Sequence, residues 1–217
     1  MAAPKLVLDH IVIGCATLEQ GVAYLRHRLG VEVPPGGRHE RMGTHNRLMQ
    51  LGGRAYLELI AIDPHGVPPG RPRWFGLDEP AQQARLAERP HLIAWVAGTA
   101  DIAASLAASP VDLGRAVEMT RGDLTWRISL HDDGTLPESG ALPVLIEWPA
   151  GPHPSARQAD LGVRLAALCV AHPAPERIAP ALAALGASHL ATLTRSEEMP
   201  MNTVELRTHD GATVTLD

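Results

Sequence analysis

Two short apolar runs decide how this chain folds: LDHIVIG at residues 8–14 and AYLELIAI at residues 55–62. Each run has the length and the β-branched, aliphatic character of a buried β-strand. Each also holds a polar residue near its middle, His10 in the first and Glu58 in the second. His and Glu are costly to bury unless a partner satisfies them, so both side chains are candidates for a functional role.

A second pair of runs repeats this pattern further along the chain. PHLIAWV at residues 90–96 contains His91, and PVLIEWP at residues 143–149 contains Glu147. Imidazole nitrogens and carboxylate oxygens together suit a divalent first-row metal such as Zn, Ni, Mn, Co or Fe. If the two repeats pack with their open faces together, the sequence predicts one metal site with four ligands: His10, Glu58, His91 and Glu147.

The segments between the paired runs predict a strand, a helix and three strands in each repeat. In the first repeat, Thr17 and Gln20 have the spacing of a capping box at a helix start, and Gly30 suits the end of that helix. Gly52 and Gly53 predict the turn of a hairpin.

The repeats divide the chain into four parts. We expect a first module at 1–63, a Pro-rich linker with a short helix at 64–89, a second module at 90–150 and a third segment at 151–217. The third segment has the same order of predicted elements. It offers Ala or Leu at the positions of the two histidines and has no Glu on its last strand, so we interpret it as structural.

This arrangement resembles the vicinal oxygen chelate superfamily, which includes glyoxalase I, extradiol dioxygenases, epimerases and bleomycin-resistance proteins. The stretches GGRHERMGTHNRLMQLGGRAYLELIAIDP at 36–64 and LPVLIEWPAGPHPS at 142–155 are similar to its glyoxalase-like domain subgroup. The resemblance implies an α+β fold in which repeated βαβββ modules form a curved mixed sheet with a cleft, with helices on the outer face.

The hairpin leaves two interpretations of Glu58 open. An even-numbered turn centred on Gly52 and Gly53 places Glu58 opposite Arg47, and opposed residues point to the same face of a sheet. A buried pair of Arg47 and Glu58 would explain the carboxylate without any metal. In the other interpretation Glu58 binds the metal, and Arg47 reaches an anionic group of the substrate.

The same alternation predicts which side chains line the cleft. His45 shares a face with Arg47, and Trp95 shares a face with His91, so we expect His45, Arg47 and Trp95 to contact the substrate. Glu147 and Glu58 are the candidates for catalytic proton transfer.

The leading interpretation is a glyoxalase-like, metal-dependent enzyme of the lyase or isomerase type, acting on a small oxygenated metabolite bound through vicinal oxygens. If Glu58 pairs with Arg47 instead, then His10, His91 and Glu147 form a two-His-one-carboxylate set, which favours iron and dioxygenase chemistry. The competing class is a metal-free protein of the bleomycin-resistance type, which binds and sequesters a small molecule.

Composition narrows the classes of partner. The net charge of −5, the pI near 6.1 and the scattered basic residues argue against a nucleic-acid partner. No apolar window is long enough to cross a bilayer, and the first residues do not resemble a secretion signal, so we expect a cytoplasmic protein with a small-molecule partner. Because such modules usually pair, the odd third segment is compatible with a homodimer.

Overall fold

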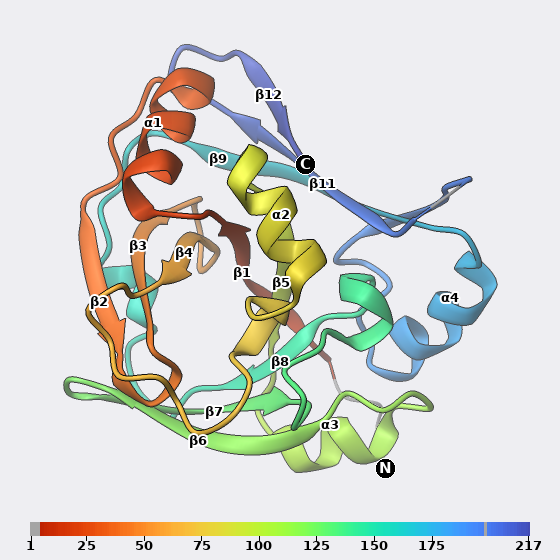
Figure 1. Ribbon diagram of the computed structural model, residues 1–217. Helices are drawn as coiled ribbons and strands as arrows, with labels where there is room; N and C mark the ends of the chain where they lie inside the picture. The colour runs from red at the N-terminus through yellow and green to blue at the C-terminus, as the bar shows by residue number, and fades with distance from the viewer. Residues whose placement is uncertain (1–4, 198) are drawn as a thin grey trace.

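The computed structural model describes residues 5–197 and 199–217 (Figure 1). Its first unit comprises β1 (Val7–Gly14), α1 (Leu18–Leu29), β2 (Pro35–His39), β3 (Thr44–Gln50) and β4 (Tyr56–Ile62). Its second comprises β5 (His91–Gly98), α3 (Ile102–Ala108), β6 (Arg115–Arg121), β7 (Leu124–Leu130) and β8 (Val144–Glu147). The short helix α2 (Pro80–Glu88) lies between them in sequence.

The two units join in one curved sheet of eight strands, in the order β2-β3-β4-β1-β5-β8-β7-β6. In each unit the first strand pairs in parallel with the last, and β1 and β5 meet antiparallel at the centre. Figure 1 shows this sheet curling around an inner space, with α1 and α3 on its outside. The curved mixed sheet of βαβββ units expected from the sequence is therefore confirmed.

The outer helices follow from local sequence. Thr17 caps α1 by accepting a hydrogen bond from the backbone N–H of Gln20 at 3.1 Å, and Gly30 ends that helix in the left-handed conformation at φ 68°. The buried face of α1 packs on the outer side of the sheet through Leu18, Val22 and Leu25. The convex side of the sheet is thus sealed from water, which leaves the concave side for a site.

The third segment forms a separate sheet of four strands. It contains β9 (Arg164–His172), α4 (Pro175–Ala184), β10 (Thr192–Arg195), β11 (Met201–Arg207) and β12 (Thr213–Leu216), in the order β10-β9-β11-β12. Here the first strand is central rather than paired with the last, so the segment shares the order of elements with the other two units but not their topology. Its apolar side chains join the same core that fills the outer side of the large sheet.

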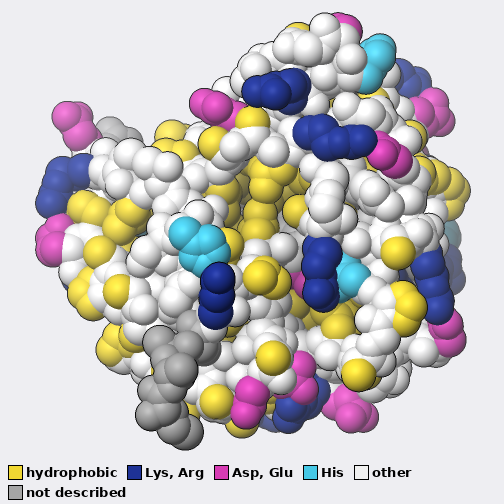
Figure 2. Space-filling model, turned by 180° about the vertical axis from the view of Figure 1, so that it is seen from behind, with side chains coloured by type: hydrophobic (Ala, Val, Ile, Leu, Met, Phe, Trp, Pro, Cys, Tyr) yellow, Lys and Arg dark blue, Asp and Glu magenta, His cyan; other side chains and the backbone are white. Residues whose placement is uncertain are grey.

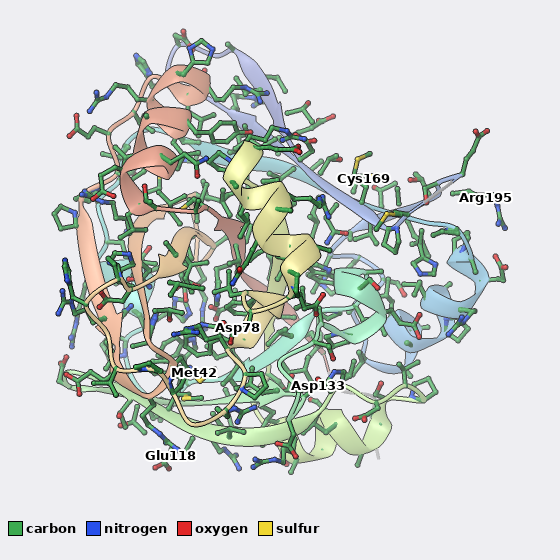
Figure 3. The ribbon with its side chains drawn as sticks, viewed as in Figure 1. Met42, Asp78, Glu118, Asp133, Cys169 and Arg195 are labelled. Carbon is green, nitrogen blue, oxygen red and sulfur yellow. The ribbon has the colours of Figure 1, made fainter. Side chains whose placement is uncertain are left out.

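The surface carries mixed charge. Figure 2 shows basic and acidic side chains scattered over that face rather than gathered in one stripe. Across 5–197 and 199–217, no helix combines the length and the apolar character needed to cross a bilayer. Cys15 is buried near the end of β1, whereas Cys169 lies on β9 in the second sheet (Figure 3), and both are free thiols.

Candidate functional site

The concave side of the large sheet holds a pocket in which all polar side chains except Arg121 come from the first unit, and the aromatic side chains come largely from the second unit and from the segment before α2. Its free space is small, about 30 Å³. The lining residues are His10, His39, Asn46, Leu48, Tyr56, Glu58, Trp74, Phe75, Arg121, Trp126, Ile128, Ile146 and Trp148.

A β-bulge places two neighbouring residues of β1 together. Leu8 pairs with Ala97 and His10 pairs with Val96, so Asp9 is one residue more than β5 can match. Because of this bulge, the Asp9 carboxylate reaches His10 instead of pointing to the opposite face, and Oδ1 of Asp9 lies 2.7 Å from Nδ1 of His10. The bond holds the imidazole with its other nitrogen, Nε2, toward the pocket.

Glu58 faces that free nitrogen from the neighbouring strand β4. Oε2 of Glu58 lies 3.5 Å from Nε2 of His10, and both side chains are almost completely buried. The side-chain amide of Asn46 on β3 donates a hydrogen bond of 2.6 Å to the other oxygen, Oε1. Glu58 is thus fixed through one oxygen, while the second is available to a proton.

The two charges stabilise each other in this buried place. Burial alone would lower the pKa of His10, but the hydrogen bonds to Asp9 and Glu58 and the charges of both carboxylates raise it from 6.5 to about 9. Burial would raise the pKa of Glu58, but His10, His39 and Asn46 lower it to about 2. At neutral pH the pair is an imidazolium and a carboxylate.

The raised pKa of His10 predicts a pH-dependent stability. The unfolded chain releases this proton near pH 6.5 and the folded chain near pH 9, so the stabilisation is complete below 6.5 and is lost as pH rises through 9. We expect the free energy of unfolding in urea to fall by about 3 kcal/mol between these values, as 1.4 kcal/mol per pKa unit implies. His10→Gln should lack this loss, and a wild-type curve that is equally flat would contradict the assignment.

His39 on β2 and Arg121 on β6 lie side by side in the lining of the pocket. Burial lowers the pKa of His39 to about 4, so its ring is neutral. Nη1 of Arg121 lies 3.3 Å from Nε2 of His39 and donates to Oδ1 of Asn46 at 3.1 Å. Within the described residues no carboxylate lies in ion-pair distance of Arg121, which leaves this cation for a bound anion.

The segment between β4 and α2, visible in Figure 1 as the strand-to-helix connection, contributes Trp74 and Phe75 to the lining of the pocket. Trp74 and Phe75 lie in a single turn of this segment and are buried. The turn is clasped by Asp78, labelled in Figure 3, which accepts hydrogen bonds of 2.7 Å from the backbone and from the guanidinium of Arg73. Phe75 has φ 59°, a strained value for a bulky residue.

Two of the four predicted metal ligands do not reach this pocket. Glu147 lies on the outer face of β8 with Leu145, where one oxygen accepts a hydrogen bond of 2.7 Å from the backbone N–H of Ile102 at the start of α3. Its other oxygen pairs with Arg127. A carboxylate at a helix N-terminus beside an arginine is satisfied without a metal.

His91 lies at the start of β5, beyond the end of the pocket. Its Nδ1 is 3.3 Å from the carbonyl oxygen of Arg89, and the residue lines a separate cavity beside α2. The two-His-one-carboxylate set of His10, His91 and Glu147, from which iron chemistry was expected, is therefore not brought together.

The predicted register of the β3–β4 hairpin is wrong by one residue. Arg47 pairs with Leu59, and Glu58 pairs with Leu48. The turn is a three-residue loop rather than a two-residue one, since Leu51 donates its N–H to the carbonyl of Ala55 at 2.9 Å. One extra residue in the turn moves every side chain of β3 to the other face.

Three residues predicted to contact the substrate lie outside the pocket for this reason or a related one. Arg47 donates to the carbonyl of Val33 at 2.9 Å, so the alternative of an Arg47 pair with Glu58 is also wrong. His45 shares the outer face with Arg47 beside α1. Trp95 is fully buried in the outer core, because a bulge at Ile93 changes the alternation along β5.

Several pocket residues were not singled out from the sequence. Asp9, like His10, is an ionisable residue inside an apolar strand, and this pattern could have identified it. Asn46 would have emerged from a correct hairpin register, because it lies two residues from Leu48 on the inner face. Arg121 ends β6 with no local signal. His153 and Trp148 also lie outside the predicted set, yet both bind Asp9.

The donor set does not fit the expected four-ligand metal centre. No group of three or more His, Cys, Asp or Glu side chains in the part of the chain described here is arranged to hold a metal ion. The second unit supplies indoles and aliphatic side chains where further ligands would have to stand, and its Arg121 would repel a cation. His10 and Glu58 remain together, and they satisfy each other.

Comparison with protein families gives one match, to the model described as a glyoxalase-like domain, over residues 8–186. None of the curated proteins is similar enough in sequence to count as a relative.

Among solved structures, a hypothetical protein from Staphylococcus aureus is similar in fold, with a TM-score of 0.60 and 15% identity over 98% of this chain and 86% of that one. Methylmalonyl-CoA epimerase from Mycobacterium tuberculosis gives a TM-score of 0.43 and 20% identity over 72% of this chain and 97% of its own. A mutant of 4-hydroxymandelate synthase from Streptomyces coelicolor gives 0.46 and 14%, over 99% and 62%. At these identities the likeness concerns the fold alone.

Proposed function

The chain belongs to the glyoxalase-like domain family, and from this premise we propose that it is an enzyme of the lyase or isomerase type that moves a proton on a small oxygenated metabolite. The observation that supports the proposal is the buried pair of His10 and Glu58 at the floor of the pocket, 3.5 Å apart. Pairs of titratable groups whose environments push their pKa values apart are typical of acid–base catalysis.

His10 is suited to stabilise a developing oxyanion. Asp9 holds the imidazolium through Nδ1, so the N–H at Nε2 points at the place where a substrate oxygen would stand. A fixed donor of this kind in a site with little water strengthens its bond as negative charge grows on that oxygen. His10 therefore acts as the electrophile, and Asp9 is its positioning residue.

Glu58 is suited to take a proton from the substrate carbon adjacent to the carbonyl carbon whose oxygen His10 binds. Its low pKa makes it a weak base while His10 faces it. A substrate oxygen that accepts the His10 hydrogen bond replaces this contact, and the pKa of Glu58 then rises toward the range of an effective base. The proton passes to Oε2, and the electron pair of the broken C–H bond becomes the double bond of an enolate whose negative oxygen His10 holds.

The rest of the pocket selects and orients the substrate. On a substrate with vicinal oxygens, return of the proton from Glu58 to the adjacent oxygenated carbon, with the hydroxyl proton moving to the other oxygen, gives an isomerase, and loss of a neighbouring leaving group gives a lyase. Asn46 keeps Glu58 in place throughout, because its amide binds the oxygen that does not carry the proton. Arg121 is placed for an anionic group of the substrate.

Divalent metals are common in the vicinal oxygen chelate superfamily, but the residues here do not fit one, and the mechanism uses the chain's own groups. A dioxygenase has no support from this geometry. A binding protein of the bleomycin-resistance type remains the second candidate, since the small pocket could hold a ligand without changing it.

Hydrogen–deuterium exchange tests the proposal. We expect the protein in D₂O to accelerate exchange at the carbon beside the carbonyl in a panel of 2-oxo acids, followed by proton NMR. Glu58→Gln should lower the enzymatic rate about 100-fold or more, because it removes the base. Glu147→Gln should leave the rate unchanged, since Glu147 is bound to α3 and Arg127 on the outer face.

Three results would count against this assignment. Ligand binding without exchange would favour the binding protein. Unchanged exchange in Glu58→Gln would remove the base. Exchange that appears with added Zn²⁺ or Ni²⁺ and disappears with a chelator would restore the metal expected from the sequence.

A further inference from the structure

Aromatic side chains are rare in this chain and concentrated at the pocket. The sequence has four Trp, two Tyr and one Phe. Five of these seven line the pocket: Tyr56, Trp74, Phe75, Trp126 and Trp148. Aliphatic residues are abundant, since 45% of the chain is hydrophobic and 3% aromatic, so filling space would not require this choice. The concentration points to a ligand that uses the faces of the rings.

The rings form two walls. Trp126 and Trp148 from the second unit lie 5.3 Å apart, centroid to centroid, and Trp74 and Phe75 from the turn before α2 stack at 5.4 Å. His39 stands between the walls, at 4.8 Å from Trp74 and 6.2 Å from Trp126. Offset and edge contacts at such distances are the geometry that a bound aromatic ring prefers.

The charge of Arg121 supplies the second requirement for a ligand. Arg121 is partly buried among these rings, and its guanidinium binds the neutral Asn46 and His39 rather than a carboxylate of the described residues. A guanidinium in such a place binds a carboxylate in a planar, bidentate manner. The ligand should therefore carry an anionic group at one end of a flat ring.

The turn that carries Trp74 and Phe75 can make room for such a ring. The present free space of about 30 Å³ holds little more than water. Phe75 also lines the neighbouring cavity beside α2, of about 460 Å³, which offers space for its ring. Neither ring is held by a hydrogen bond, because Phe75 has no polar side-chain atom and the Nε1 of Trp74 has no partner among the described residues, so both rings can shift while Asp78 keeps its bonds to Arg73.

We propose that the pocket takes a planar aromatic carboxylate, with the ring between the Trp126–Trp148 wall and the displaced Trp74–Phe75 turn and the carboxylate on Arg121. This deepens the proposed function and rests on the same site.

Calorimetric titration with three matched probes tests this inference: benzoate, cyclohexanecarboxylate and benzyl alcohol. We expect benzoate to bind about 10-fold more tightly than cyclohexanecarboxylate, which has the same charge and size but no π face. Arg121→Gln should weaken benzoate about 10-fold and leave benzyl alcohol unchanged. Arg115→Gln is the control, because Arg115 lies on the same strand but is exposed and paired with Asp132.

The indole N–H resonances of the four tryptophans locate the binding. Benzoate should shift the signals of Trp74, Trp126 and Trp148 and leave that of Trp95, which lies in the outer core. Equal affinity for benzoate and cyclohexanecarboxylate, no measurable benzoate binding, or a shift confined to Trp95 would overturn the inference. Benzoate-type binding without proton exchange on any 2-oxo acid would overturn the proposed function and leave this inference standing.

Discussion

Replacing Asp9 with Ala is expected to lower the free energy of unfolding by about 3 to 5 kcal/mol. The Asp9 carboxylate is buried and binds three side chains: Nδ1 of His10 at 2.7 Å, Nε1 of Trp148 at 3.0 Å and Nε2 of His153 at 2.9 Å. The substitution leaves these buried donors without an acceptor and leaves the His10 imidazolium beside a single carboxylate. Such orphaned groups cost more than the bonds themselves contributed.

Urea denaturation of the two proteins measures this loss, with Arg47→Ala as the matched control. Arg47 also makes a hydrogen bond to a residue distant in sequence, the carbonyl of Val33 before β2, but on the outer face and away from the pocket, so its removal should cost about 1 kcal/mol. The pKa of His10, followed by NMR, should fall in Asp9→Ala because one of the carboxylates that raise it is gone. A loss no larger than that of Arg47→Ala would show that Asp9 is not the anchor of the site.

The elements of this fold could be predicted because their signals are local. The capping residues of α1 and the length of each apolar run depend on neighbours in sequence, and they placed β1 and α1 close to their observed bounds. The repeat of strand, helix and three strands predicted two similar units, whereas the way in which they join was an expectation from the resemblance to the superfamily.

The face of the sheet on which each side chain lies, and the register between strands, could not be predicted as well as the elements themselves. A three-residue turn in place of a two-residue turn moved Arg47 to the outer face, and the bulges at Asp9 and Ile93 changed the alternation along β1 and β5. Neither the three-residue turn nor the β-bulges have a sequence signature strong enough to predict their positions.

The four ionisable residues in apolar strands illustrate a further limit. The position of each residue in an apolar strand indicates that its side chain needs a partner, but the sequence does not identify that partner. His10 and Glu58 contact each other. Glu147 binds the N-terminus of α3 and Arg127, and His91 contacts a backbone carbonyl. A costly burial therefore predicts an interaction, and its chemistry depends on the tertiary neighbours.

Ending the chain at residue 160 is expected to abolish folding altogether, although no residue of the pocket is removed. The apolar residues of the third segment, such as Val170, Leu182 and Leu206, belong to the same core cluster as Trp95 and Met49 of the large sheet. Burial of each large aliphatic side chain contributes about 1.5 to 3 kcal/mol, so losing several of them exceeds the ~5 to 15 kcal/mol that a domain of this kind has in total.

The truncation also cuts backbone connections between the two sheets. The N–H of Leu92 on β5 donates to the carbonyl of Asp217 at 2.7 Å, and the N–H of Leu165 donates to the carbonyl of Leu51 at 3.0 Å. The shortened chain should therefore aggregate or show no cooperative unfolding by circular dichroism, whereas the full chain with Glu205→Ala, an exposed change on β11, should melt as the wild type does. A chain of 160 residues that stays monodisperse and unfolds cooperatively would mean that the eight-stranded sheet closes its outer face by itself, and that the third segment has a role other than covering it.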